Sequence, residues 1–239
     1  MARSDIGDSA REAGRLAARP RFGESFAEAP RGGQELRLDS SRDGLVYVPP
    51  TYRPGRPSPL LLMLHGAGGE AQKILRPVLA PAEAHGVVVL APESRGRTWD
   101  VILGDYGPDV AFIDRALDQT FARYEIDPAR IAVGGFSDGA SYALSLGVIN
   151  GDLFTHVLAF SPGFMAPTGQ ADSPRIFMSH GIADQVLPIE VCSRRLAPAL
   201  RGAGYDLRYV EFDGGHLMPR EIVEAAFGWF LGQGGQGGE

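Results

Sequence analysis

Runs of apolar residues alternate with amphipathic stretches along most of the chain. Leu60–Leu64 is apolar at every position, which is typical of a strand buried on both faces of a sheet. Val87–Leu90 repeats this pattern, and Ile131–Phe136 is a third apolar stretch. Between them, Asp109–Tyr124 carries apolar residues at helical spacing. This alternation predicts an α/β fold with a mostly parallel central sheet and helices on both faces.

The remaining elements follow the same alternation and define one folded domain. Further strands are predicted at Glu35–Leu38, Leu45–Val48, Val157–Phe160, Arg175–Ser179 and Leu207–Phe212. Further helices are predicted over residues 71–85, directly after Ser137, and over Ile189–Ala203 and Pro219–Leu231. We therefore expect a single domain over residues 35–232. Prolines and glycines interrupt residues 1–34, which predicts a flexible N-terminal arm, and residues 233–239 form a flexible, glycine-rich tail.

Composition and charge argue against several classes of partner. The 239 residues are 44% hydrophobic and carry a formal net charge of −6 without a basic stripe, so we expect no nucleic acid to bind. No stretch approaches the roughly 18 apolar residues of a membrane span, and the N-terminal segment lacks the apolar core of a secretory signal. The single cysteine, Cys192, requires no oxidising compartment. We expect a cytoplasmic protein, and the sequence leaves open whether it forms a homodimer.

The stretch Gly135-Phe136-Ser137-Asp138-Gly139 joins the third apolar run to a helical pattern. It fits the motif G-x-S-x-G, in which a serine lies on a sharp turn between a strand and a helix. The glycines leave room for this turn, because flanking Cβ atoms would clash with it. The turn also leaves the first amides of the helix free to face a developing oxyanion. Ser137 is therefore the candidate nucleophile.

Two further polar residues follow predicted strands and complete a candidate catalytic triad. Asp184 comes shortly after one strand, and His216 follows the last strand in a loop with Gly214 and Gly215. Since the carboxyl ends of parallel strands meet at one edge of a sheet, we expect Ser137, Asp184 and His216 to lie together. A serine is a weak nucleophile at neutral pH and needs both a base and a group that orients the base. We assign these roles to His216 and Asp184.

Other assignments fit the spacing less well. Asp213 competes for the role of the acid, but it lies too close to His216 in the sequence. His180 is expected to make a structural hydrogen bond. The five histidines are scattered and form no H-E-x-x-H motif, so we expect neither a metal ion nor metal-dependent hydrolysis.

The turn after the first buried strand is expected to supply the second half of an oxyanion hole. It reads His65-Gly66-Ala67-Gly68-Gly69, and its glycines expose backbone amides. We therefore assign the oxyanion hole to the amides of Ala67 and Asp138. His65 is expected to brace the turn.

In the order and spacing of these motifs, the chain resembles the α/β-hydrolases of the phospholipase/carboxylesterase or polyhydroxybutyrate-depolymerase-like esterase group. The resemblance covers about residues 40–232 and rests on Leu64–Gly69, Gly135–Gly139, Ser179–Val186 and Gly214–His216. It implies the α/β-hydrolase fold and cofactor-free hydrolysis of a small-molecule carboxylic ester or thioester. Only residues 161–174 are available for a cap, so we expect no cap domain and an open site.

Several large side chains near the predicted strand ends are candidates for substrate contacts. They are Trp99, Tyr106, Phe164, Met165, Leu187 and Leu217, and packing in the core is an equally good interpretation for each. Trp99 is the preferred candidate, because it lies in a polar, glycine-rich loop. Two alternatives to an esterase stay open, a peptidase with the same triad and a binding protein of the same fold without catalysis.

Overall fold

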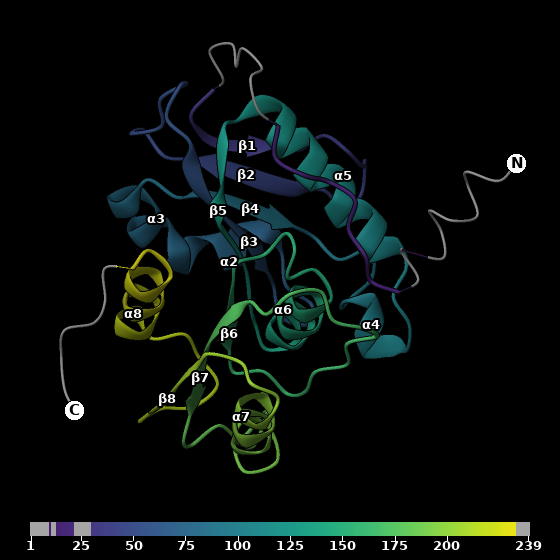
Figure 1. The fold of residues 1–239 in the computed structure, drawn as a ribbon, viewed down its shortest axis with the longest axis vertical. Coiled ribbons are helices and arrows are strands. Elements are labelled where there is room, and N and C mark those ends of the chain that lie inside the picture. The colour runs from purple at the N-terminus through teal and green to yellow at the C-terminus, as the bar shows by residue number, and fades with distance from the viewer. Residues whose placement is uncertain (1–9, 11–12, 22–29, 233–239) are drawn as a thin grey trace, which may run out of the picture.

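A sheet of eight strands crosses the computed structural model, which describes residues 10, 13–21 and 30–232 (Figure 1). The strands lie in the order β1-β2-β4-β3-β5-β6-β7-β8. β2 runs antiparallel to both of its neighbours, and each adjacent pair from β4 to β8 is parallel. The predicted α/β fold with a mostly parallel sheet is confirmed.

The elements agree with the predicted alternation. The strands are β1 (Gly32–Glu35), β2 (Gly44–Val48), β3 (Ser58–Leu64), β4 (Val88–Pro92), β5 (Ile126–Phe136), β6 (His156–Phe160), β7 (Arg175–Gly181) and β8 (Leu207–Phe212). The helices are α2 (Ala71–Leu75), the 3₁₀ helix η1 (Arg76–Val78), α3 (Leu79–His85), α4 (Asp100–Leu103), α5 (Pro108–Arg123), α6 (Asp138–Ile149), α7 (Ser193–Gly202) and α8 (Arg220–Phe230). Within the described ranges, no helix combines the length and apolar character needed to cross a membrane.

The strand β3 is buried on both faces, as its sequence predicts. Leu60, Leu62 and Leu64 pack in a hydrophobic cluster on one face of the sheet. Leu61 and Met63 pack in a second cluster on the other face. β3 pairs with β4 on one side and β5 on the other, so every side chain of its apolar run is removed from water.

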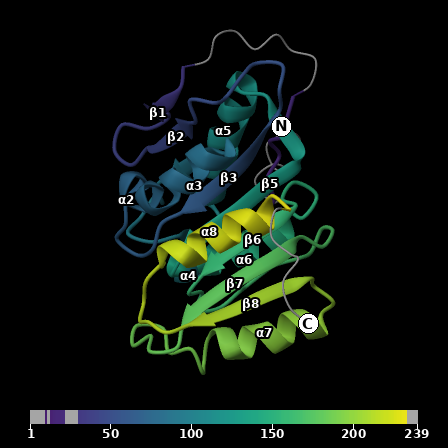
Figure 2. The ribbon, with the colours of Figure 1, turned by 90° about the vertical axis from the view of Figure 1, so that its left-hand side faces the viewer.

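Helices cover both faces of the sheet (Figure 2). α5 and α6 supply Phe112, Phe121 and Tyr142 to the first cluster. α2 and α8 supply Ile74 and Phe227 to the second. The connection between β6 and β7, the segment considered for a cap, is irregular over residues 161–174 and contains no helix.

Residues 13–21 pack against the domain, so the prediction of a flexible arm over residues 1–34 is wrong for this segment. Leu16 is buried, and its amide donates to Asn150 Oδ1 over 2.8 Å. Arg15 Nη1 donates to Asp152 Oδ1, also over 2.8 Å. These polar partners of Leu16 and Arg15 thus lie directly after α6, and no local pattern in the arm indicates them. The tail at 233–239 and the rest of the arm before residue 30, except residue 10, lie outside the described residues.

The first strand ends before the position that the sequence predicts. β1 stops at Glu35, whereas the prediction placed a strand at Glu35–Leu38. Arg37 has a φ of 58°, and the carboxylate of Asp43 accepts hydrogen bonds from the amides of Arg37 and Leu38 over 2.7 and 2.9 Å. An aspartate that binds nearby amides competes with the sheet ladder, and here the local turn is favoured.

Candidate active site

Ser137 lies on a tight turn between β5 and α6. Its backbone has φ 58° and ψ −121°, a strained conformation for a residue with a side chain. Two glycines make the turn possible. A Cβ on Gly135 would lie 2.2 Å from Gly139 O, and a Cβ on Gly139 would lie 2.3 Å from Leu64 O. The candidate nucleophile is therefore held at the N-terminus of α6, next to the end of β3.

Asp184 and His216 form a hydrogen-bonded pair. His216 Nδ1 lies 2.6 Å from Asp184 Oδ2, and Asp184 Oδ1 accepts the amides of Val186 and Leu187, each over 2.9 Å. Burial raises the pKa of Asp184, but these amides and His216 lower it more, so the net shift is downward. The carboxylate is thus charged, His216 Nδ1 donates to it, and Nε2 is left as the nitrogen that accepts a proton.

The register of the sheet brings the predicted residues to one edge. Phe136 at the end of β5 pairs with Phe160 at the end of β6. A Cβ on Gly181 would lie 2.3 Å from Gly215 O, so the loops after β7 and β8 are in direct contact. The ring centroids of Phe136 and His216 are 4.6 Å apart. The loops that carry the predicted serine, aspartate and histidine therefore meet at this edge.

The amides of Ala67 and Asp138 donate no hydrogen bond to any residue in the described ranges. Ala67 is exposed in the turn after β3, and Asp138 is the first residue of α6. The amide of the neighbouring Gly68 donates to Arg97 O over 2.7 Å, which holds the turn against the loop after β4. Both amides are thus available to an acceptor from outside the chain, and the helix N-terminus favours a negative charge there.

Trp99 lies in the core behind the turn that carries Ala67. Its side chain is fully buried, its Nε1 donates to His65 O over 2.7 Å, and it stacks on Tyr142 with ring centroids 5.2 Å apart. Tyr106 is also buried and extends the stack on Tyr142 at 5.9 Å. The predicted substrate contacts of Trp99 and Tyr106 are therefore wrong. The polar loop turns its aromatic side chains inward, where burial of large rings is favourable and the indole N–H finds an acceptor.

His65 braces the same turn, as predicted. It is 1% exposed, its Nδ1 donates to Gly66 O over 2.7 Å, and its Nε2 accepts the amide of Ser94 over 3.0 Å. Burial lowers its pKa, which agrees with a neutral ring that donates on one side and accepts on the other. Arg42 Nη2 adds a hydrogen bond to Gly69 O over 3.0 Å.

The other four predicted substrate contacts lie in the loops after β6, β7 and β8. Phe164 is 37% exposed and Leu217 is 46% exposed. Leu187 and Met165 are half-buried. Apolar surface is therefore present in the loops around the candidate triad, and its contact with a substrate stays a prediction.

Three polar side chains that hold the loops around Ser137 were missed in the sequence. Thr98 Oγ1 donates to Asp138 Oδ2 over 2.6 Å, which ties the start of α6 to the loop after β4. The hydroxyls of Ser141 and Ser145 each accept an amide of the β6–β7 connection over 2.9 Å. Both serines follow Ser137 at intervals of four residues. This spacing, which places them on one helix face, is the signal that could have identified them.

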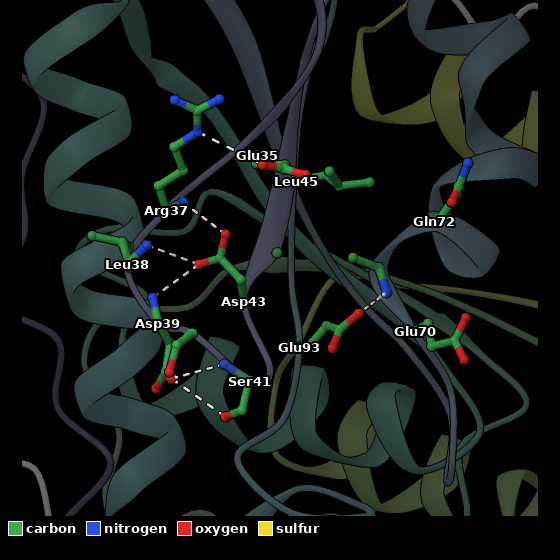
Figure 3. A pocket seen from close by; sticks show the side chains of 13 residues that line it. Glu35, Arg37, Leu38, Asp39, Ser41, Asp43, Leu45, Glu70, Gln72 and Glu93 are labelled. Carbon is green, nitrogen blue, oxygen red and sulfur yellow. Dashed lines mark hydrogen bonds and ion pairs between the residues drawn. The ribbon is translucent and has the colours of Figure 1, made fainter.

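A polar hollow of about 710 Å³ lies beside the β1–β2 connection and the start of α2 (Figure 3). Its carboxylates have partners, since Asp43 accepts the amides of Arg37 and Leu38, and Glu93 accepts the amide of Ala71 over 3.1 Å. None of the predicted catalytic residues lines it. In the part of the chain that the structure describes, no group of three or more His, Cys, Asp or Glu residues could hold a metal ion.

Known esterases share sequence or fold with this chain. The model of the phospholipase/carboxylesterase family matches residues 110–227. Feruloyl esterase C of Emericella nidulans is 28% identical over 159 residues, which are 63% of this chain and 58% of that protein. A bifunctional acetylxylan esterase/xylanase of Neocallimastix patriciarum is 31% identical over 157 residues, which are 62% of this chain and 22% of that protein. The match thus spans little more than half the length of the feruloyl esterase.

The fold has a close counterpart among solved structures. The propionate-bound structure of the thermophilic esterase Est2 of Thermogutta terrifontis aligns with a TM-score of 0.66. The alignment covers 91% of this chain and 100% of that chain, at 20% sequence identity. At this identity the likeness shows a shared fold, so chemistry has to be argued from the site.

Proposed function

We propose that this chain, which belongs to the α/β-hydrolase esterase group, is a serine hydrolase that cleaves carboxylic esters, thioesters included. The observation that carries this proposal is the 2.6 Å hydrogen bond between His216 and Asp184 at the sheet edge where Ser137 directly precedes α6. The relatives named as feruloyl and acetylxylan esterases support a carboxylic ester as the bond that is cleaved.

The proposed reaction passes through an acyl-enzyme. Ser137 Oγ attacks the ester carbonyl while His216 Nε2 accepts its proton, and the charged Asp184 stabilises the imidazolium that forms. The two available amides, of Ala67 and Asp138, bind the oxyanion of the tetrahedral intermediate. The imidazolium then protonates the leaving alcohol. A water molecule attacks the acyl-enzyme in the same way and releases the carboxylic acid.

The surroundings of the site support an apolar group on the substrate. Phe164 and Leu217 are exposed apolar residues in the loops after β6 and β8, and Leu187 lies between them in sequence on the loop after β7. Covering such side chains with an apolar acyl or alcohol group contributes about 25 cal/mol per Å² of buried area. The irregular β6–β7 connection lacks a helical cap, so we propose a site that is open to dissolved small molecules.

Labelling of the nucleophile tests the proposal directly. Wild-type protein, Ser137→Ala and Ser41→Ala are treated with a fluorophosphonate probe and assayed on p-nitrophenyl esters from acetate to dodecanoate. Ser41 is an exposed serine in the β1–β2 connection and serves as the matched control. We expect labelling and turnover in wild type and Ser41→Ala, and neither in Ser137→Ala. The chain-length profile then measures the size of the acyl pocket.

Two results would redirect the assignment. A labelled protein that cleaves short peptides but none of the esters would favour a peptidase with the same triad. A folded wild-type protein that neither labels nor turns over any ester would reject the esterase and leave a binding protein of this fold.

A further inference from the structure

His180 is a second histidine in contact with the acid of the candidate triad. It lies on β7, and its side chain and that of Asp184 are both fully buried. His180 Nε2 lies 2.8 Å from Leu187 O and 3.2 Å from Asp184 Oδ2. His180 Nδ1 lies 2.7 Å from Ser193 Oγ at the start of α7. One imidazole therefore joins the carboxylate, the turn that follows it and the next helix.

The neighbours of His180 determine which nitrogen carries its proton. Leu187 O and the charged Asp184 Oδ2 can only accept hydrogen bonds, so Nε2 must be the N–H donor to both. In the neutral ring, Nδ1 then accepts the hydroxyl proton of Ser193. Burial lowers the pKa of His180, which favours this neutral form. Every polar atom of the ring has a partner in this arrangement.

We propose that His180 is a positioning residue that fixes the Asp184 carboxylate for its role toward His216, an inference that rests on the proposed function. Asp184 Oδ2 receives hydrogens from two imidazoles, His216 at 2.6 Å and His180 at 3.2 Å. Asp184 Oδ1 receives the amides of Val186 and Leu187. Without His180, the two amides on Oδ1 are the remaining hydrogen-bond donors, among the described residues, that oppose a rotation of the carboxylate away from His216.

The neutral state of His180 matters for the charge of the pair. A cation 3.2 Å from Asp184 Oδ2 would offset the carboxylate charge that stabilises the imidazolium of His216 during the reaction. A neutral N–H donor orients the same oxygen and leaves that charge in place. Leu187 also links the two side chains, since its amide donates to Asp184 Oδ1 while its carbonyl accepts from His180.

Glutamine and asparagine at position 180 separate the contact with Asp184 from the contact with Ser193, because their side chains differ in length. In His180→Gln the amide nitrogen reaches the position of Nε2 and still donates toward Asp184. In His180→Asn it reaches only the position of Nδ1 and faces Ser193. We expect kcat to fall about 10- to 100-fold in His180→Asn with KM within about threefold, and to stay within about threefold in His180→Gln. Thermal unfolding and far-UV circular dichroism establish that both variants are folded.

A double-mutant cycle tests whether His180 acts through Asp184. In an Asp184→Asn background, His180→Asn should change kcat by less than about twofold, because the group that it orients is already lost. A purely structural residue would reduce activity by the same factor in both backgrounds. Equal losses in the two backgrounds, or a His180→Asn variant within twofold of wild type, would overturn the proposal.

A measurement that needs no substrate tests the positioning role independently of the esterase assignment. The downfield proton resonance of the His216 Nδ1–H should be present in wild type and His180→Gln and broadened or lost in His180→Asn, whether or not any ester is cleaved. An unchanged resonance in folded His180→Asn would refute the positioning role. If His180→Asn does not fold, Ser193→Ala replaces it. If Ser193→Ala then has the same kcat and the same resonance as wild type, His180 contributes only to stability and the proposal is rejected.

Discussion

Replacing Trp99 by phenylalanine tests whether this residue braces the turn over His65–Gly69, which carries the proposed oxyanion donor Ala67. The indole Nε1 donates to His65 O over 2.7 Å, and the ring stacks on Tyr142 with an interplanar angle of 13°. Phenylalanine keeps an apolar ring at this fully buried position but has no hydrogen to donate. The carbonyl of His65 would then lose a partner one residue before Gly66 and two residues before Ala67, at the base of the turn.

The expected loss of stability follows from these contacts. A buried carbonyl that loses its donor costs about 1–3 kcal/mol, and the smaller ring gives up part of a stacking interaction worth about 0.5–1.5 kcal/mol. We therefore expect Trp99→Phe to lower the free energy of unfolding by about 2–4 kcal/mol. For a domain of this size, such a loss lowers Tm by about 5–15 °C.

The kinetic effect should be confined to the chemical step. Complete loss of one oxyanion donor costs about 10²- to 10³-fold in kcat, so a loosened turn should cost less, about 3- to 30-fold, with KM nearly unchanged. Trp229→Phe is the matched control, because Trp229 is the other tryptophan, is 6% exposed and lies on α8 against Phe177 and His156. It should lower Tm while leaving kcat within about twofold, since it is remote from the turn.

The assay combines thermal unfolding with steady-state hydrolysis of a p-nitrophenyl ester by both variants. A Trp99→Phe variant with unchanged Tm and a raised KM would refute the reasoning and restore Trp99 as a substrate contact. Equal falls in kcat for Trp99→Phe and Trp229→Phe would also refute it, because the effect would then follow from stability rather than from the turn.

Three further predictions concern backbone space and pH. Gly139→Ala places a Cβ 2.3 Å from Leu64 O and 2.5 Å from His65 O, so we expect a loss of about 1–3 kcal/mol in unfolding free energy and slower fluorophosphonate labelling; unchanged labelling would contradict the close approach. Gly228→Ala, with no atom near its Cβ on α8, should instead stabilise the protein by about 0.5–1 kcal/mol in the same thermal unfolding assay. Burial lowers the pKa of His156 to about 4; because the unfolded chain binds the proton first, stability should fall by about 2–3 kcal/mol as pH drops from about 6.5 to 4. In urea titrations across this range, His156→Gln should show a smaller fall than wild type, and parallel curves would rule His156 out as the cause.

The elements, and the sheet edge where the candidate triad lies, follow from local sequence. A run such as Leu60–Leu64 can satisfy its side chains only when both faces of the strand are covered, so it predicts an interior strand without any knowledge of its neighbours. The same holds for the turn at Ser137, because only glycines at positions 135 and 139 leave space for it. Asp184 could be proposed beside His216 because parallel strands end at one edge.

The inward or outward direction of loop side chains could not be predicted in this way. Trp99 lies in a polar loop, and its burial depends on a carbonyl acceptor at His65, 34 positions earlier in the chain. Residues 13–21 show the same limit, since Leu16 is held by Asn150, 134 positions away. Neither contact produces a periodic pattern in the sequence, because each joins two irregular segments.

His180 shows most clearly which contacts local sequence predicts and which depend on tertiary packing. Its sequence position after a predicted strand indicated a structural hydrogen bond, which is a local inference. Only the packed structure shows that Asp184, Leu187 and Ser193 surround the ring and thereby set its proton on Nε2. Periodicity and turn chemistry act over a few neighbouring residues and determine the sheet, the helices and the strand-end loops. The partners of a buried polar group come from distant segments, and only the tertiary packing decides them.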